Sequence, residues 1–467
     1  MVGLNVMKKR VLILGLLLFF GVPSEADAIT TKNLAKSKIP TSTLETTLLT
    51  ENKVKVGTIN YDEILEKAQA HSYDLKIADF NVLIAKQEVR GARSEYFPKL
   101  NAIAANEYTK NFRDIRESTV MSIGESFINP YTRYQAMLGI TLNYNLFDFG
   151  VRKGNLDIAK EDIFIKELET QQKRQDLTLS LIENYSKILV TQKQININKE
   201  ILALELKNLD YKTRLFNAKE ISKTDLNDAK VRVNKVNKDI AELKSIKSEA
   251  LSWLSFYTGE DYDADNLKIA DLKKTDFDIL KYNDYTNSVT WQIYEKQLKK
   301  KELELKVAKK AYLPKVNAYS RYYWYGSDHD SYGKSFDEIQ PSNYSIGGSV
   351  YMPLFDGFKT SANIQKTALE LKQLQVERDK SIAQLMTKVG IMRSNLMYID
   401  EQIAINKQAI SELTDKEKSV RKLVSKKVLT PIDANESKIE LLEQQLELEK
   451  NEVTEVALTK GIQILTE

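Results

Sequence analysis

The chain has few of the residues that catalysis, disulfide frameworks and tight turns require. Among 467 residues there are no cysteines, two histidines, 8 prolines and 17 glycines. Without cysteine there is neither a disulfide framework nor a lipid-modified N-terminal thiol. His71 and His329 alone cannot supply the usual nucleophile–base pairs or metal clusters, and we expect both to be solvated. The sequence therefore predicts no enzyme, no cofactor and no metal site.

The chain also has no large excess of positive or negative charge. The 69 Lys and Arg residues nearly balance the 65 Asp and Glu residues, and the two kinds are interspersed along the chain. A nucleic-acid-binding surface would need a one-sided basic patch, so no nucleic acid is expected as a partner. Little glycine and proline with much Lys, Glu and Leu is typical of long helices.

Long apolar runs are absent except at the N-terminus. Basic residues there precede the apolar run 11–22, which is shorter than the roughly 20 residues that span a bilayer. Ala26 and Ala28 then form a small-residue cleavage signal. This order predicts a signal peptide over 1–28, with a buried N-terminal helix as the alternative, followed by an N-terminal extension over 29–60.

Three landmarks occur twice in the same order, which indicates an internal two-fold repeat. We predict a first repeat over 61–260, a connecting equatorial segment over 261–285 and a second repeat over 286–467. The paired landmarks are "EYFPKLNA" (95–102) with "AYLPKVNA" (311–318), Leu-Phe-Asp at 146–148 and 354–356, and "LFNAKEISKTD" (215–225) with "LVSKKVLTPID" (423–433).

The duplicated prolines mark junctions between helix and strand. Helical periodicity ends just before Pro98 and Pro314, and a residue that precedes proline is biased away from the helical region. After each proline the apolar residues alternate with period two, which predicts strands. The four predicted strands are 97–108, 134–147, 315–325 and 344–355.

These strands are long, their ends are rich in aromatic residues and the chain is predicted to be exported. The pattern favours outer-membrane strands over an ordinary half-buried sheet. Inside lipid every backbone group must be paired, so four strands cannot close a barrel alone. Two copies would give eight strands and three would give twelve, and only the wider barrel leaves an aqueous lumen.

Heptad spacing follows each strand pair. After Gly150 a helical period continues for about 65 residues, and within it apolar residues fall at sevens. A matching series in the second half is broken once by Glu417. Such repeats predict supercoiled helices about 100 Å long. Shorter return helices are predicted over 223–257 and 431–465. The two series are Leu181, Ile188, Ile195, Leu202, Leu209 and Phe216, and Val389, Leu396, Ile403, Ile410 and Val424.

The ordered, duplicated landmarks resemble the TolC family of outer-membrane efflux and secretion channels, over about 61–467. The resemblance implies a mixed α and β membrane protein in which four strands per chain build a trimeric 12-stranded barrel. It also implies a periplasmic barrel of coiled-coil helices. The function implied is a passive channel of a tripartite efflux pump or type I secretion system. Its partners would be outer-membrane lipid, a periplasmic adaptor (membrane fusion) protein and an inner-membrane efflux or ABC transporter.

The resemblance also implies gate residues where the long helices turn. Asp225, Asp433 and Glu436 match acidic positions that ring the periplasmic aperture in that family. The first two also fit as helix caps after Ser222 and Thr430. Where the family has glycine, Lys219 and Lys427 stand, which predicts altered turn geometry. Ion pairs of Lys426 or Lys427 with Asp225 or Glu220 of neighbouring tips are hypothesised for the closed state.

A different class of protein also fits part of the pattern. A periplasmic coiled-coil scaffold or adaptor without a pore would explain the export signal and the heptads. It leaves the four alternating strands and their aromatic ends unexplained.

Overall fold

A computed structural model describes residues 55–110, 134–274 and 285–466, all within the unit Val54–Glu467. The predicted signal peptide 1–28, most of the extension 29–60 and most of the predicted loop 109–133 lie outside the described residues. We consider only the described unit below.

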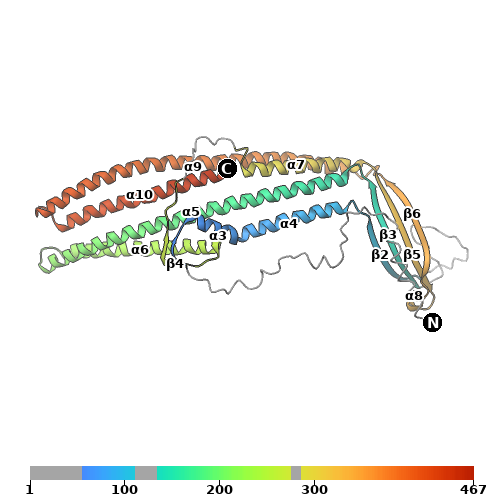
Figure 1. The fold of residues 1–467 in the computed structure, drawn as a ribbon, viewed down its shortest axis with the longest axis horizontal. Coiled ribbons are helices and arrows are strands. Elements are labelled where there is room, and N and C mark those ends of the chain that lie inside the picture. Colours follow the sequence, from blue (N-terminus) through green and yellow to red (C-terminus); the bar gives the residue numbers. More distant parts are fainter. Residues whose placement is uncertain (1–54, 111–133, 275–284, 467) are drawn as a thin grey trace. The chain divides into compact units, whose positions relative to one another are not determined.

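Long helices make up most of the unit (Figure 1). Two of them, α5 and α9, have 67 residues each, and the helices that follow them, α6 and α10, have 36 residues each. The helices are α3 (Tyr61–His71), α4 (Tyr73–Ser94), α5 (Val151–Asn217), α6 (Lys223–Thr258), α7 (Val289–Lys309), α8 (Tyr332–Asp337), α9 (Lys359–Ser425) and α10 (Pro431–Thr466), with a 3-10 turn, η4 (Lys310–Tyr312), after α7.

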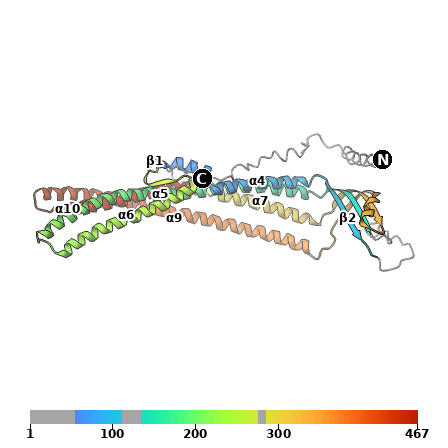
Figure 2. The same ribbon diagram turned by 90° about the horizontal axis from the view of Figure 1, so that it is seen from below.

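Each 67-residue helix is flanked by two shorter helices placed one beyond the other. α6 packs on the C-terminal part of α5 and α4 on its N-terminal part, and α10 and α7 flank α9 in the same order (Figures 1 and 2). α10 and α7 also pack on α5 and so join the two hairpins. The arrangement explains why the return helices are half as long as their partners.

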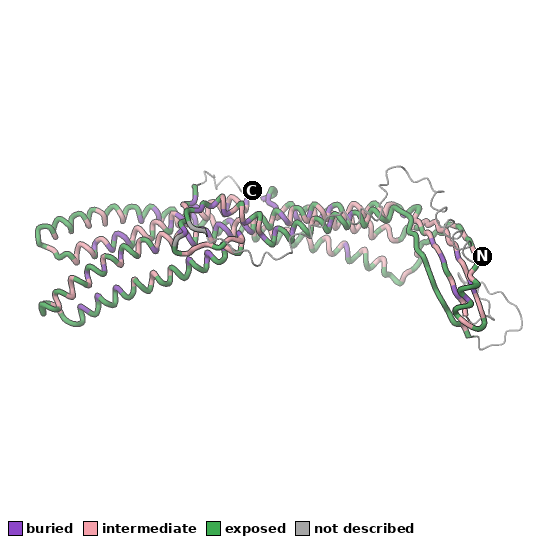
Figure 3. Tube along the Cα trace, turned by 60° about the horizontal axis from the view of Figure 1, so that its bottom comes forward, coloured by how far each residue is buried: buried purple, intermediate pink, exposed green. Residues whose placement is uncertain are grey.

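The main core lies where α3, α5 and α6 meet a small parallel sheet. Ile64, Leu181, Tyr185 and Leu254 are fully buried there. The heptad positions nearest this core are buried, whereas those toward the α5–α6 and α9–α10 turns are only half-buried (Figure 3). Apolar side chains near the turns therefore lack a complete set of neighbours within one chain.

The small sheet joins β1 (Lys55–Ile59) to β4 (Tyr262–Ile269) in parallel. The buried Lys247 ammonium supports it by donating to the carbonyl oxygens of Ala264 and Leu267, at 2.7 and 3.2 Å. Burial lowers the pKa of Lys247. This sheet occupies part of the predicted connecting segment, and strand pairing there was not expected.

A second, four-stranded antiparallel sheet has the order β2-β3-β5-β6. Its strands are β2 (Lys99–Tyr108), β3 (Tyr134–Phe147), β5 (Lys315–Asp328) and β6 (Gln340–Tyr351). β2 and β5 begin directly after Pro98 and Pro314. Within the described residues, β2 and β6 each pair along one edge only.

The predicted bounds of the last two strands were wrong. β5 extends to Asp328, and β6 occupies Gln340–Tyr351 in place of 344–355. Proline accounts for the end of β6, because Pro353 cannot donate a ladder hydrogen bond. At the start of β6, a register shift beside Trp324 allows Pro341 to be part of the strand. α8 occupies part of the connection between β5 and β6.

The two faces of this sheet differ in charge. Cross-strand partners lie on the same face, so the register places Lys99, Glu107, Lys315 and Arg321 together on one face, here called the polar face. The opposite, apolar face carries a single charged strand residue, Asp328, at the end of β5. Several of its aliphatic side chains are exposed, among them Leu100 by 61%, Ile346 by 70% and Val350 by 69%.

Candidate functional site

The turns that close the two hairpins have the same backbone geometry. Lys219 and Lys427 adopt left-handed φ values of 64° and 58°. The amides of Lys219 and Glu220 donate back to Phe216 and Leu215, and the second turn repeats this Schellman pattern. Both lysines thus adopt the left-handed conformation that glycine takes up most readily, although a left-handed lysine costs about 1 kcal/mol or more.

Asp225 and Asp433 cap the helices that follow these turns. The Asp225 carboxylate accepts hydrogen bonds from the Ser222 amide and hydroxyl at 3.0 and 2.7 Å, and the Asp225 amide donates to that hydroxyl oxygen. Asp433 and Thr430 repeat the arrangement. The hydroxyl hydrogen bonds lower the pKa of both carboxyls. Capping thus occupies both side chains, and an additional role at an aperture stays a prediction.

Two contacts near the turns join the first hairpin to the second. Glu436 on α10 accepts a hydrogen bond from Arg232 on α6, with 3.0 Å between Oε1 and Nη1. Beside it, the Asn435 amide on α10 donates to the side-chain oxygen of Asn208 on α5 at 2.7 Å. The buried Asn208 amide nitrogen has no hydrogen-bond partner among the described residues.

Arg232 and Asn208 were not predicted from the sequence. Arg232 is exposed and Asn208 is buried, but neither belongs to a duplicated landmark, so only the packing of α6 and α5 beside α10 identifies them. The other predicted residues near the turns, Glu220, Lys426 and Lys427, are exposed and form no ion pair with described residues of this chain. Their hypothesised pairs would require a second copy.

The two strand-to-helix junctions share a sequence but differ in their contacts. Asp148, 5% exposed, pairs with Arg152 at 2.9 Å between Oδ2 and Nε. The Arg152 guanidinium also donates to the carbonyl oxygens of Glu95 and Leu146, which ties α5 to the end of α4 and to β3. At the second junction Asp356 accepts from Thr360, without an arginine.

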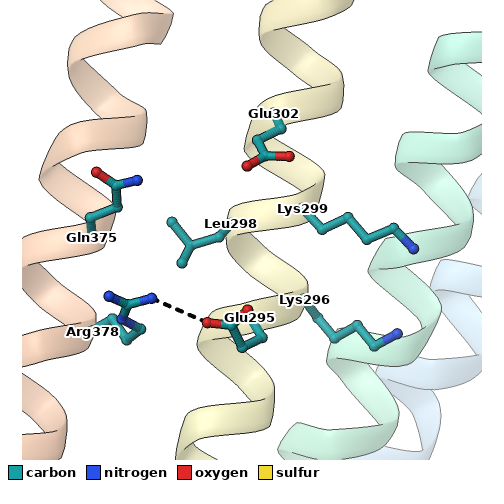
Figure 4. A pocket seen from close by; sticks show the side chains of 7 residues that line it. All are labelled: Glu295, Lys296, Leu298, Lys299, Glu302, Gln375 and Arg378. Carbon is teal, nitrogen blue, oxygen red and sulfur yellow. Dashed lines mark hydrogen bonds and ion pairs between the residues drawn. The ribbon is translucent and has the colours of Figure 1, made fainter.

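A shallow pocket lies between α7 and α9 (Figure 4). Glu295 and Arg378 form an ion pair across it at 3.2 Å. Lys299 points toward α5 and pairs with Glu161. These contacts are side-chain pairs between neighbouring helices, and they present no converging set of groups for a ligand.

The two histidines occupy different surroundings. His329 is exposed just after β5. His71 is half-buried against Tyr73 and Gly259, and burial lowers its pKa. The expectation that His71 is simply solvated was wrong. Within the described ranges, no group of His, Asp and Glu side chains could hold a metal ion, and no helix combines the length and apolar character needed to cross a membrane.

Comparison with known proteins gives two kinds of match. Residues 64–260 match the family model for outer membrane efflux proteins. No curated protein matches the chain in sequence.

Solved structures match the fold over most of both chains. The CusC channel has a TM-score of 0.69 at 15% identity and covers 88% of this chain and 93% of its own. The outer membrane protein VceC of Vibrio cholerae has a TM-score of 0.69 at 14% identity and covers 86% and 95%. The CmeC outer membrane channel of Campylobacter jejuni has a TM-score of 0.66 at 14% identity and covers 86% and 85%.

Proposed function

We propose that this chain is an outer-membrane efflux channel protein of the TolC family and that three copies of it form one passive conduit. The observation that carries the proposal is the two-faced sheet. Its apolar face carries exposed apolar side chains in β2, β3 and β6 and half-buried ones in β5, and its strand charges, apart from the terminal Asp328, lie on the other face. Lipid outside and water inside would suit these two faces.

The edges of the sheet support assembly. β2 and β6 have unpaired outer edges among the described residues, and an unpaired edge is excluded from hydrocarbon. β6 of one copy pairing with β2 of the next would satisfy both. Three copies then give a closed barrel of twelve strands with an aqueous lumen.

Two of the helices carry exposed apolar side chains that neighbouring copies could cover. On α4, exposed apolar side chains follow helical spacing at Tyr73, Ile77, Phe80 and Ile84. On α9, Ile391, Tyr398 and Ile405 are exposed at sevens. Packing of such stripes between copies would form a barrel of helices that continues the conduit into the periplasm.

We place the gate at the turns between the long helices. The Arg232–Glu436 ion pair and the Asn435–Asn208 hydrogen bond would hold the two hairpins together in the closed state. The unpaired side-chain nitrogen of Asn208 would form a hydrogen bond with water when the hairpins separate. This hydrogen bond would lower the free-energy cost of opening. Docking of a periplasmic adaptor and an inner-membrane efflux or ABC transporter would drive the separation, in an efflux pump or type I secretion system.

Single-channel recording of the detergent-purified protein, after its mass in detergent is measured, tests the proposal. A trimer that inserts into a planar bilayer with small, long-lived, cation-preferring steps is the expected result. A large unselective conductance would keep the conduit but reject a gate at the acidic turns. Folded protein that never inserts and fractionates with the soluble periplasm would instead favour the scaffold.

A further inference from the structure

The short helix α8 packs on the apolar face of the four-stranded sheet. It follows the C-terminal end of β5, far from the junction with the long helices, and it contacts β3 and β5 (Figure 1). A Cβ atom added to Gly326 of β5 would overlap the Ser335 carbonyl oxygen of α8. Gly326 lies opposite Ala136, which shares the apolar face with Leu138 two residues along β3. Ala136 and Ser335 are fully buried, so the helix lies directly against this face.

Aromatic rings continue from α8 across the end of the sheet. The Tyr332 ring of α8 lies 4.7 Å from the Tyr134 ring, measured between centres, and Tyr134 lies 5.0 Å from the Tyr108 ring of β2. Tyr134 and Tyr108 are directly opposite each other on the apolar face. Tyr332 and Phe336 are one helical turn apart and are 43% and 46% exposed, and Tyr108 is 44% exposed. Three partly exposed rings therefore lie on the face that we propose for lipid.

The position of α8 along the strands fits the boundary of a lipid layer. From Leu146, near the junction with α5, to Ala136, beneath α8, strand β3 advances by ten residues on the apolar face. At about 3.3 Å per residue and a strand tilt of about 40°, this advance spans about 25 Å along a barrel axis. The apolar band of outer-membrane barrels is also about 25 Å tall. α8 thus lies where such a band would end.

Charged side chains appear at the same level. Asp328 lies opposite Tyr134 at the end of β5, and Lys334 of α8 is exposed and pairs with Asp330 at 2.8 Å. Charges of this kind are costly inside hydrocarbon, which places α8 outside the hydrocarbon layer. The exposed rings are favourable beside apolar chains and wet headgroups alike. Rings and charges together are typical of the layer between hydrocarbon and water.

We propose that α8 lies in the headgroup layer at the outer surface of the membrane, where Tyr332 and Phe336 contact lipid. Aromatic side chains are enriched at this level because an apolar ring meets the acyl chains while a hydroxyl group stays hydrated. The inference rests on the proposed function, in which the apolar face of the sheet meets lipid. It makes α8 the element that sets how deeply the barrel sits in the membrane.

The depth of single nitroxide labels tests the inference. Because the chain has no cysteine, Phe336→Cys gives one labelling site in an otherwise unchanged channel. In phosphatidylcholine vesicles, collisions of the label with oxygen, which concentrates in lipid, are compared with collisions with a nickel chelate that stays in water. Ile346→Cys marks the hydrocarbon band, since Ile346 is 70% exposed on the apolar face. Gln135→Cys is the matched control, because Gln135 precedes Ala136 and lies on the polar face.

We expect the ratio of oxygen to nickel collisions at Phe336→Cys to be several-fold above that at Gln135→Cys and clearly below that at Ile346→Cys. Tyr332→Cys should give the same intermediate ratio and serves if the first variant does not fold. Each labelled variant is first shown to conduct as the wild type does.

The remaining outcomes separate the inference from the proposed function. A ratio at Phe336→Cys as low as that at Gln135→Cys, a ratio as high as that at Ile346→Cys, or a label shielded from both reagents would overturn the placement of α8. If the ratio at Ile346→Cys is high, the lipid face still stands in each of these cases. A low ratio at Ile346→Cys in conducting channels would overturn the lipid face itself, and the placement of α8 with it.

Discussion

Removal of the Glu436 charge should make the closed channel open more often. Glu436→Gln keeps the size of the side chain and weakens its contact with Arg232, which joins the second hairpin to the first. A contact that exists only while the hairpins lie together stabilises the closed state alone. Loss of the contact therefore shifts the equilibrium between closed and open channels toward the open state.

The size of the expected change follows from the exposure of the Arg232–Glu436 ion pair and from the number of copies in the channel. The Arg232 and Glu436 side chains are 51% and 44% exposed, and an exposed ion pair contributes about 0.5 kcal/mol. If the three copies open together, the loss per trimer is about 1.5 kcal/mol, or roughly tenfold in the ratio of open to closed channel. Salt should reduce the difference between variant and wild type, because exposed charges are screened.

Open probability in planar bilayers at low ionic strength measures the effect. Glu440→Gln is the control, since the Lys416–Glu440 pair has nearly the same exposure, 51% and 49%, but joins α9 to α10 within one hairpin. Glu440→Gln should leave the open probability unchanged. If both variants open equally often, or if Glu436→Gln behaves as wild type, the cross-hairpin contact does not hold the gate and the reasoning is refuted.

Three further predictions concern the sheet, the junctions and the turns. Gly347→Ala should lower the thermal unfolding temperature because its Cβ would lie 2.8 Å from the Tyr319 ring, whereas Gly348→Ala, with its nearest atom at 3.6 Å, should not; equal losses would contradict the assigned faces. Asp148→Asn should destabilise the protein by about 3 kcal/mol because it removes the charge of a buried carboxylate that pairs with Arg152, measured by thermal unfolding, and Asp356→Asn should cost clearly less. Acid should loosen both turns, measured by hydrogen exchange corrected for its intrinsic pH dependence. The pKa of each capping aspartate is lowered on folding, so its stabilisation is complete above the unfolded value near 3.9 and is lost as pH falls through the folded value. If hydrogen exchange in the first turns of α6 and α10 stays constant over this pH range, the capping role of the two aspartates is contradicted.

The sequence predicts elements whose signals are local. Pro98 and Pro314 each precede a strand at the next residue, and the heptads give helices whose ends lie within a few residues of the predicted ones. Backbone restriction by proline and the spacing of apolar side chains act over a few residues, so they can be read without a partner. The resemblance to TolC-family channels, built from these landmarks, is confirmed by the family match and the fold.

Features that depend on the neighbour of a segment could not be predicted. β1 pairs with β4 across some 200 residues of chain, and α8 folds within what the alternating pattern suggests is a loop. Nothing in a lysine indicates a left-handed backbone, which at Lys219 and Lys427 follows from the Schellman hydrogen bonds. Arg232 meets Glu436 only because two hairpins pack together. The heptads likewise predict a buried stripe without identifying the helix that covers it.

Differences between the two repeated halves identify residues that folding alone does not require. By the 216-residue offset of the duplicated phrase, Tyr319 and Arg321 correspond to Ile103 and Ala105, which occupy the same face of β2 in an equivalent strand. Ile103 and Ala105 support that strand without a stacked ring or a guanidinium. An equivalent strand thus forms without an aromatic ring or a guanidinium at these positions, so Tyr319 and Arg321 are unnecessary for strand formation.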